Sequence, residues 1–193
     1  RDDVESRGLG DVYKRQVFRF AGIHAPELHR IEDDARGTCK ADSRGWGQYF
    51  RWPTAEEQEN WIKALVQTGA RAQRVYVLSV QQAFDEACGR ETHILAPETA
   101  DGMPRLNEKA MRVYDNMIAE ADKQGLRLIL PFIDHWWWWG GREQLAAFYH
   151  EKPEDFYRTD SKTFKAYLDV IRQVITRTCL LYTSDAADEL DGV

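Results

Sequence analysis

Residues Leu126–Gly141 read LRLILPFIDHWWWWGG, a buried strand pattern that runs directly into an aromatic loop. The first eight residues are almost all apolar, as in a strand covered on both faces of a sheet. Pro131 is compatible with such a strand near its end or at an edge. We therefore predict a strand over 126–133, followed by four consecutive tryptophans and two glycines.

Two further apolar runs predict strands, VFRFAGI at 17–23 and RVYVLSV at 74–80. The second is rich in the β-branched and aromatic residues that strands favour. A helical pattern follows each of the three strands. Before the first of these helices, Thr54 and Glu57 have the spacing of a capping box, and Gly69 is placed to end the helix. Its expected inner face holds Trp61, Ile62, Leu65 and Val66.

The other two helices show the same apolar periodicity. Asn107 is the expected cap of the second helix, which ends at Gly125, and its inner face holds Met111, Tyr114, Met117, Ile118 and Ala121. Thr159 or Asp160 is the expected cap of the third helix. Its inner face is predicted to hold Phe164, Tyr167, Leu168, Ile171, Val174 and Ile175.

Strand and helix thus alternate three times, which is typical of a parallel α/β fold. The long loops, 23–53, 81–105 and 134–159, all follow strands, whereas the connections from helix to strand are short. This asymmetry favours a (β/α)8 barrel with its site at the carboxyl ends of the strands. An open doubly wound sheet is the alternative, but no GxGxxG or GxxxxGK[ST] motif follows a strand. A complete barrel needs roughly 250 residues. We predict the N-terminal part of a TIM barrel, about three β/α units.

The two ends of the chain are related through one DNA element. DVYKRQ at 11–16 can be encoded by GATGTGTATAAGAGACAG, and the reverse complement, read from its second base, encodes CLLYTS, which stands at 179–184. Both ends resemble translated sequencing adapters. We therefore expect residues 1–16 and 179–193 to be adapter-derived tails, and 17–178 to be a partial TIM-barrel domain from a metagenome-like source.

Composition indicates a globular chain of 193 residues, with 43% hydrophobic and 30% charged residues and a net charge of −6. The acidic balance and the absence of a basic stripe argue against nucleic acid as a partner. No apolar run approaches the roughly 20 residues that span a bilayer. No His, Cys or carboxylate spacing indicates a metal site.

The candidate binding residues follow the predicted strands. A flat indole matches the apolar C–H face of a pyranose ring, so at least one tryptophan of the loop is expected to contact sugar, with Trp136 first and Trp138 or Trp139 next. The rest of the cluster is expected to pack beneath the loop. Polar residues after the first and third strands are expected to hydrogen-bond sugar hydroxyls; they are His24, Glu27, Asp134 and His135.

Four segments in order carry a resemblance to a known family: FRFAGIHAPEL, GARAQRVYVLSV, EADKQGLRLILPFIDHWWWWGG and DFYRTDSKTFKAYLDVIRQVITRT. Together they resemble the N-terminal part of glycoside hydrolase family 5, in clan A, and most closely its β-mannanase and cellulase-like members. The resemblance implies retaining hydrolysis of a β-linked polysaccharide, mannan-type in the first place and glucan in the second.

The resemblance also implies specific roles. Arg74 matches the family's arginine that keeps the nucleophile ionised. The acid/base and nucleophile glutamates are expected beyond Thr178, where Cys179 stands in place of the family's asparagine, so the chain alone is expected to be inactive. The family uses no cofactor. The parent is expected to be a monomer that binds polysaccharide or oligosaccharide and is secreted, periplasmic or on the cell surface.

Two readings of other classes stay open: a non-catalytic carbohydrate-binding protein, and a TIM-barrel enzyme outside glycan chemistry. The first would predict an antiparallel β-sandwich, which the strand–helix alternation disfavours. Cys39 and Cys88 lie in neighbouring loops, and the sequence leaves open whether they pair.

Overall fold

The computed structural model describes residues 20–31, 50–86 and 88–188, and for Pro26 and 178–188 it describes the backbone alone. Its elements in chain order are β1 (Gly22–Ala25), the 3-10 helix η2 (Pro26–Leu28), α2 (Ala55–Gln67), β2 (Ala72–Val75), β3 (Ile94–Leu95), β4 (Arg105–Leu106), α3 (Glu108–Lys123), β5 (Arg127–Ile129), α4 (Arg142–Ala147), the 3-10 helix η3 (Pro153–Tyr157) and α5 (Lys162–Asp188).

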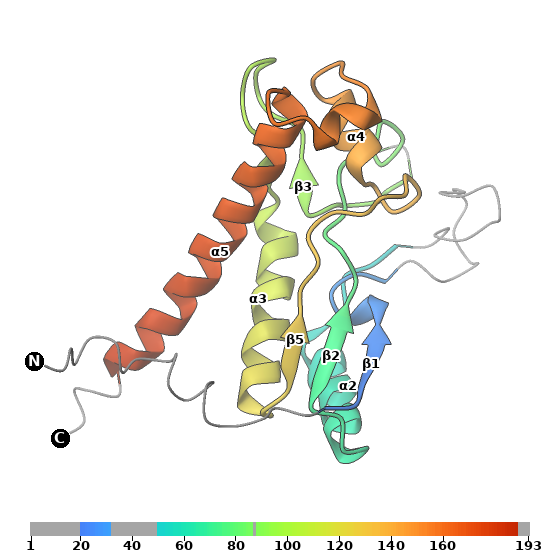
Figure 1. The fold of residues 1–193 in the computed structure, drawn as a ribbon. Helices are drawn as coiled ribbons and strands as arrows, with labels where there is room; N and C mark the ends of the chain where they lie inside the picture. The colour runs from blue at the N-terminus through green and yellow to red at the C-terminus, as the bar shows by residue number, and fades with distance from the viewer. Residues whose placement is uncertain (1–19, 32–49, 87, 189–193) are drawn as a thin grey trace, which may run out of the picture.

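The three main strands form a parallel sheet in the order β1-β2-β5. Figure 1 shows α2 and α3 behind this sheet, and the carboxyl ends of the strands pointing toward the end of the molecule that carries β3 and α4. The core lies between sheet and helices, with Val75, Ile62 and Met117 fully buried in it. The predicted parallel α/β fold is confirmed.

The strands are shorter than the apolar runs that predicted them. β1 begins at Gly22, and residues 17–19 of the expected first strand lie outside the described part of the chain. Beyond β2 the chain is no longer part of the regular parallel sheet, but it still makes single backbone contacts. The Leu78 N–H donates to the Phe132 carbonyl at 3.0 Å, and Val80 forms an isolated parallel bridge with Ile94. The apolar run continues because this extension is itself buried.

Helix α2 begins at the predicted capping box, in which Thr54 Oγ1 accepts from the Glu57 N–H and the Glu57 carboxylate accepts from the Thr54 N–H. The expectation for Trp61 was wrong, because its side chain is 49% exposed. Gln58 takes the buried place instead. Its amide donates to the carbonyls of Leu28 and Val113, which satisfies a polar group inside the core.

Helix α3 follows its prediction closely. Asn107 Oδ1 accepts from the Lys109 N–H at the helix start. All the residues expected on the inner face are buried, because positions three and four apart share one side of a helix. Gly125 after the helix has φ of +69°, and the next N–H, of Leu126, donates back to the Ala121 carbonyl.

Helix α5 lies beside α3 (Figure 1), and Arg177 pairs with Asp115 across the contact at 2.7 Å. Its inner face differs from the prediction. The buried stripe is Thr163, Ala166, Val170 and Val174, whereas Leu168 and Ile175 are 49% and 48% exposed. Tyr167, which was also expected on the inner face, is partly buried and packs against the core.

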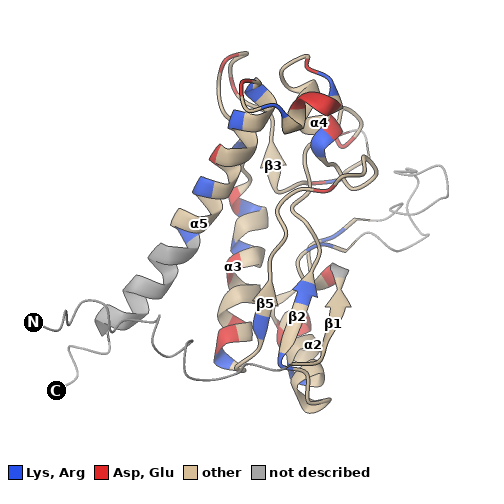
Figure 2. Cartoon of the chain, viewed as in Figure 1, with Lys and Arg blue, Asp and Glu red and all other residues tan. Residues whose placement is uncertain are grey.

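Charged residues of both signs are interspersed over the described helices, as Figure 2 shows for α3 and α5. No helix in the described ranges is both long and apolar enough to cross a membrane.

Candidate functional site

Two predicted site residues, His24 and Arg74, are brought together at the carboxyl end of the sheet. They are register partners in β1 and β2 and lie on the face away from the helices, where both are exposed. His24 Nδ1 lies 3.0 Å from the Arg74 carbonyl oxygen, which only accepts, so Nδ1 carries the proton. The other nitrogen, Nε2, is then free to accept from Arg74 Nη1 at 3.3 Å.

Tyr76 continues this group two residues beyond Arg74. Its hydroxyl donates to Asp134 Oδ2 at 2.8 Å, and its ring lies 5.8 Å from the His24 ring. Burial, then the hydrogen bond and charge of Asp134, raise the pKa of the Tyr76 hydroxyl well above its ordinary value. The phenol therefore stays protonated near neutral pH and acts as a fixed donor.

The four tryptophans divide between surface and core. Trp136 and Trp137 are 62% and 39% exposed, Trp138 is half-buried, and Trp139 is 3% exposed. The Trp139 Nε1–H donates to the Val77 carbonyl at 3.0 Å, beneath the loop. Trp139 is thus a core residue, and its expected contact with sugar is not supported by its position.

Both Trp139 and Trp138 contact the Tyr76 ring, and the more exposed of the two is Trp138. Its ring centroid lies 5.7 Å from that of Tyr76, and the Gln82 side-chain amide donates to its backbone carbonyl. Arg74, His24, Tyr76, Asp134 and Trp138 therefore form one continuous set of contacts across the ends of three strands. We call these five residues the inner site.

Trp136 and His135 form a second, outer group. Their rings lie 5.1 Å apart, edge to face, and both are exposed. Arg142 Nη2 lies 3.4 Å from His135 Nε2, and its guanidinium stands over the Tyr157 ring at 5.4 Å. The loop places Trp136 next to Asp134, whose Oδ1 accepts from the Trp136 N–H.

Glu27 is placed beside α2. It lines a separate pocket of about 510 Å³ beside α2, together with Arg51, Glu57 and the exposed Trp61. Arg51 makes a bidentate ion pair with Glu57 at 2.7 Å, and this cation lowers the Glu57 pKa to about 2.

Sequence analysis missed the role of Tyr76, although the alternation of an extended chain places it on the same side as Arg74. It also missed the buried polar residues beneath the loop. Arg30 is fully buried; its Nη1 donates to the Trp139 carbonyl and its guanidinium lies 4.6 Å from the Trp139 ring centroid. No local pattern in the sequence points to Arg30, because its partner stands 109 residues away.

Metal-binding groups and cysteines add little to this site. Within the described residues, no cluster of three or more His, Cys, Asp or Glu side chains has the arrangement of a metal site. Cys88 is disulfide-bonded. Its partner lies outside the side chains that the structure describes, and Cys39 falls among the residues not described.

The inner site combines kinds of side chain that are commonly found in small-molecule sites. It combines a phenol, a carboxylate, a guanidinium and an imidazole beside an aromatic face. Small-molecule sites commonly combine apolar and aromatic walls with a few placed polar groups. The position at the carboxyl ends of parallel strands is where barrel enzymes carry their sites.

Solved structures of mannan-active enzymes share this fold. The endo-1,4-beta-mannanase from Rhizomucor miehei superposes with a TM-score of 0.59 and 15% identity, over 81% of this chain and 37% of that chain. The endo-beta-1,4-mannanase from Thermotoga petrophila gives a TM-score of 0.57 and 16% identity, over 82% of this chain and 30% of that chain. A glycoside hydrolase family 5 mannosidase from Rhizomucor miehei gives a TM-score of 0.50 and 16% identity, over 79% of this chain and 37% of that chain.

These likenesses define the class of fold. No family model matches the chain, and no curated protein matches it in sequence. The chain spans about a third of the length of the structures it resembles. It has the fold of one part of a (β/α)8 barrel of the kind found in family 5 glycoside hydrolases, so the expected resemblance is confirmed at the level of the fold.

Proposed function

We propose that the chain is part of a retaining endo-β-glycosidase of glycoside hydrolase family 5, which hydrolyses a β-linked polysaccharide. The inner site carries this proposal, because it joins an aromatic face to four hydrogen-bonding side chains at the carboxyl ends of the strands. The mannanase fold of the structural relatives favours mannan over glucan as the substrate.

Each residue has a role in this proposal. Trp138 and the exposed Trp136 stack on sugar rings, and Asp134 and His135 bond sugar hydroxyls. Arg74 stands close to the nucleophile and helps to keep it ionised, because a nearby cation lowers the pKa of a carboxyl group. The two catalytic glutamates lie beyond Thr178, about 5–5.5 Å apart as in retaining enzymes.

The parent protein works outside the cytoplasm in this proposal, as a monomer. A polysaccharide is too large to cross a membrane unaided, so an enzyme that cleaves it must meet it in a secreted, periplasmic or cell-surface position. The disulfide at Cys88 supports an oxidising compartment. Nucleic acid and cofactors have no part in the reaction.

The complete reading frame tests the reaction. The expressed protein is incubated with mannan, glucan and xylan, and the anomeric configuration of the first product is followed by NMR. We expect hydrolysis of mannan with retention, and its loss when the glutamate after the fourth strand is replaced by glutamine. Binding without cleavage would overturn the enzymatic proposal in favour of a carbohydrate-binding protein. Activity on a non-glycan substrate alone would point to another barrel enzyme.

The 193-residue chain tests the site itself. Titration with a β-1,4-linked manno-oligosaccharide, followed by calorimetry, measures the affinity. We expect Trp138→Ala to weaken binding at least about tenfold, since a buried aromatic contact commonly carries more than 1.4 kcal/mol. Trp61→Ala is the matched control, because Trp61 lies beside α2 in the separate pocket. Equal losses in both variants would argue against a sugar site at Trp138.

A further inference from the structure

Two histidines are fully buried beneath the inner site and hydrogen-bonded to each other. His29 Nδ1 lies 3.0 Å from His93 Nε2, although 64 residues separate them. His29 Nε2 lies 2.9 Å from the Tyr76 carbonyl oxygen. At the other end, His93 Nδ1 lies 3.2 Å from the Ser79 backbone nitrogen and 2.8 Å from Ser79 Oγ.

These contacts permit one arrangement of protons. The Tyr76 carbonyl only accepts, so His29 Nε2 must donate. The Ser79 backbone N–H only donates, so His93 Nδ1 must accept. If both rings are neutral, His29 Nδ1 accepts from His93 Nε2–H, and every ring nitrogen is paired. A proton added to either ring would place two N–H groups against each other.

The surroundings also disfavour a charge on either ring. The always-charged Arg30 is fully buried close by, and the Trp52 and Tyr114 rings pack edge-on against the pair at 5.2 and 5.3 Å. Burial first, and then the positive charge of Arg30, lower the pKa of His29, to about 4; the Tyr76 carbonyl opposes this shift. Burial, then His29 and Arg30, lower the pKa of His93 well below its usual value.

The pair connects three segments that are distant in sequence. His29 follows η2, Tyr76 and Ser79 lie on the extension of β2, and His93 precedes β3. The bond to the Tyr76 carbonyl holds the backbone of the residue whose hydroxyl bonds Asp134. The next carbonyl along the chain, that of Val77, accepts the indole N–H of Trp139.

We propose that His29 and His93 are positioning residues, which act as a neutral relay that sets the backbone at Tyr76 and thereby the orientation of the inner site. Their role in sugar recognition rests on the proposed function above. The relay itself does not rest on the proposed function, because it is defined by the proton arrangement of the two rings and by its effect on Tyr76 and Trp139.

Nitrogen-15 NMR of the 193-residue chain tests the proton arrangement without any substitution. We expect both rings to be protonated at Nε2 and bare at Nδ1 at neutral pH, with N–H protons that exchange slowly with water. The exposed ring of His150 gives the comparison for rapid exchange. A proton on Nδ1 of either buried ring, or a charged ring at neutral pH, would overturn the relay.

Variants test the positioning role. His29→Gln keeps a donor for the Tyr76 carbonyl but has no atom at the position of Nδ1, to which His93 donates. Tyr114→Phe is the matched control: its ring contacts the same pair, and its buried hydroxyl has no hydrogen-bond partner among the described residues. We expect His29→Gln, and not Tyr114→Phe, to shift the indole N–H resonance of Trp139. Resonances that stay in place in a folded His29→Gln chain would exclude a positioning role.

Sugar binding separates this proposal from the function on which it rests. We expect His29→Gln to weaken manno-oligosaccharide binding at least about fivefold while Tyr114→Phe leaves it within twofold. If the unsubstituted chain binds no oligosaccharide, the proposed function fails, and the tautomers and the Trp139 resonance still decide the relay. If the unsubstituted chain binds the oligosaccharide and His29→Gln binds it equally well, a role of His29 in recognition is contradicted.

A milder variant is available if His29→Gln fails to fold. Ser79→Ala removes only the hydroxyl next to His93. A Trp139 indole resonance that does not shift in Ser79→Ala would count against the relay.

Discussion

At the scale of single residues, Gly140 joins the aromatic loop to the sheet. The Val80 N–H donates to its carbonyl at 3.0 Å, and its φ is +92°. A Cβ at this position would lie 2.0 Å from the Val80 carbonyl oxygen. The loop can reach the sheet this closely because no side chain stands between them.

We therefore expect Gly140→Ala to lower the free energy of unfolding by more than about 3 kcal/mol, from the positive φ and from the overlap together. Gly69→Ala separates the two effects. Gly69 has a similar φ of +86°, but an added Cβ would meet nothing within 4 Å, so a loss of about 1–2 kcal/mol is expected there. Urea unfolding measures both, and equal losses would show that the contact with Val80 is unimportant.

The buried histidines make stability depend on pH. In the unfolded chain His29 takes up a proton below its ordinary pKa of 6.5, whereas in the folded chain it does so only near pH 4. The unfolded state therefore binds more protons between these values, and stability is lost as the pH falls from 6.5 toward 4. At about 1.4 kcal/mol per pKa unit, His29 accounts for a loss of about 3 kcal/mol.

Urea unfolding at pH 7, 5.5 and 4.5 measures this dependence. The free energy of unfolding is expected to fall less steeply with decreasing pH in His29→Gln than in the unsubstituted chain. His150→Gln, which changes an exposed side chain, is the control and is expected to keep the slope of the unsubstituted chain. The comparison with His29→Gln removes the contribution of the carboxylates that titrate in the same range. A slope as steep in His29→Gln as in the unsubstituted chain would refute the assignment.

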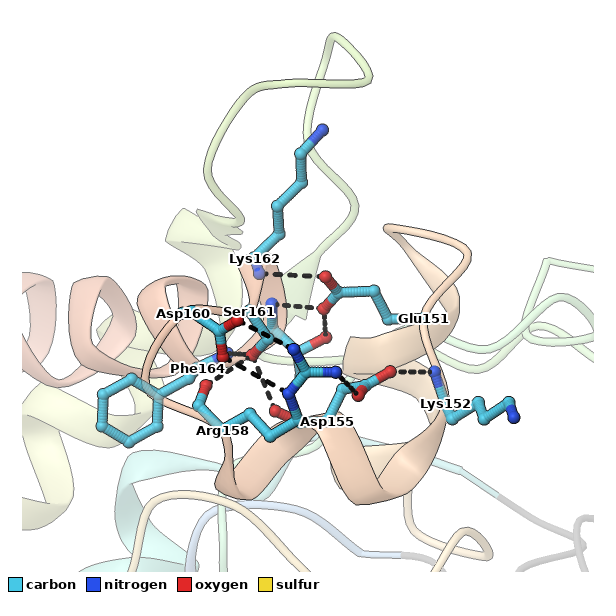
Figure 3. A network of polar contacts seen from close by, with 9 residues as sticks. Glu151, Lys152, Asp155, Arg158, Asp160, Ser161, Lys162 and Phe164 are labelled. Atoms are coloured by element: carbon cyan, nitrogen blue, oxygen red, sulfur yellow. Dashed lines mark hydrogen bonds and ion pairs between the residues drawn. The ribbon is translucent and has the colours of Figure 1, made fainter.

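At the scale of elements, the start of α5 depends on a polar network that Figure 3 shows. Ser161 Oγ accepts from the Phe164 N–H at 2.9 Å, and on the other side the Glu151 carboxylate accepts from the N–H groups of Lys162 and Thr163. Ser161 is therefore the N-cap, and the expectation of Thr159 or Asp160 was wrong. Asp160 instead pairs with Arg158 at 2.8 Å.

The two candidate caps provide a direct comparison. Ser161→Ala is expected to cost about 1–2 kcal/mol of stability, because it leaves the first turn of α5 without one of its acceptors. Thr159→Ala changes an exposed side chain and is expected to stay within about 0.5 kcal/mol. Thermal unfolding measures both variants, and a larger loss of stability in Thr159→Ala than in Ser161→Ala would contradict this assignment.

At the scale of the whole molecule, large apolar side chains remain exposed on the described surface. Leu168 and Ile175 lie on α5, and Ile129 lies on the open face of the sheet; each is about half exposed. Apolar groups of this size tend to associate when they are adjacent on a surface. We expect the 193-residue chain to self-associate as its concentration rises.

Leu168→Lys combined with Ile175→Lys is expected to increase the monomer fraction at a given concentration. Gln67→Lys combined with Thr159→Lys adds the same charge at exposed positions outside α5 and is expected to change little. Size-exclusion chromatography with light scattering measures the monomer fraction. An equal gain in both double variants would attribute the effect to net charge rather than to the α5 surface.

The sequence by itself determined the features that depend on short-range spacing. The capping box of Thr54 and Glu57 and the cap and inner face of α3 follow from residues within a few positions of each other. The parallel sheet was predicted from the alternation of strand and helix patterns along the chain. Only the tertiary structure decided which tryptophan is core and that His29 meets His93. Those outcomes depend on contacts between distant segments, and a buried polar group is stable only where such a contact supplies its partner.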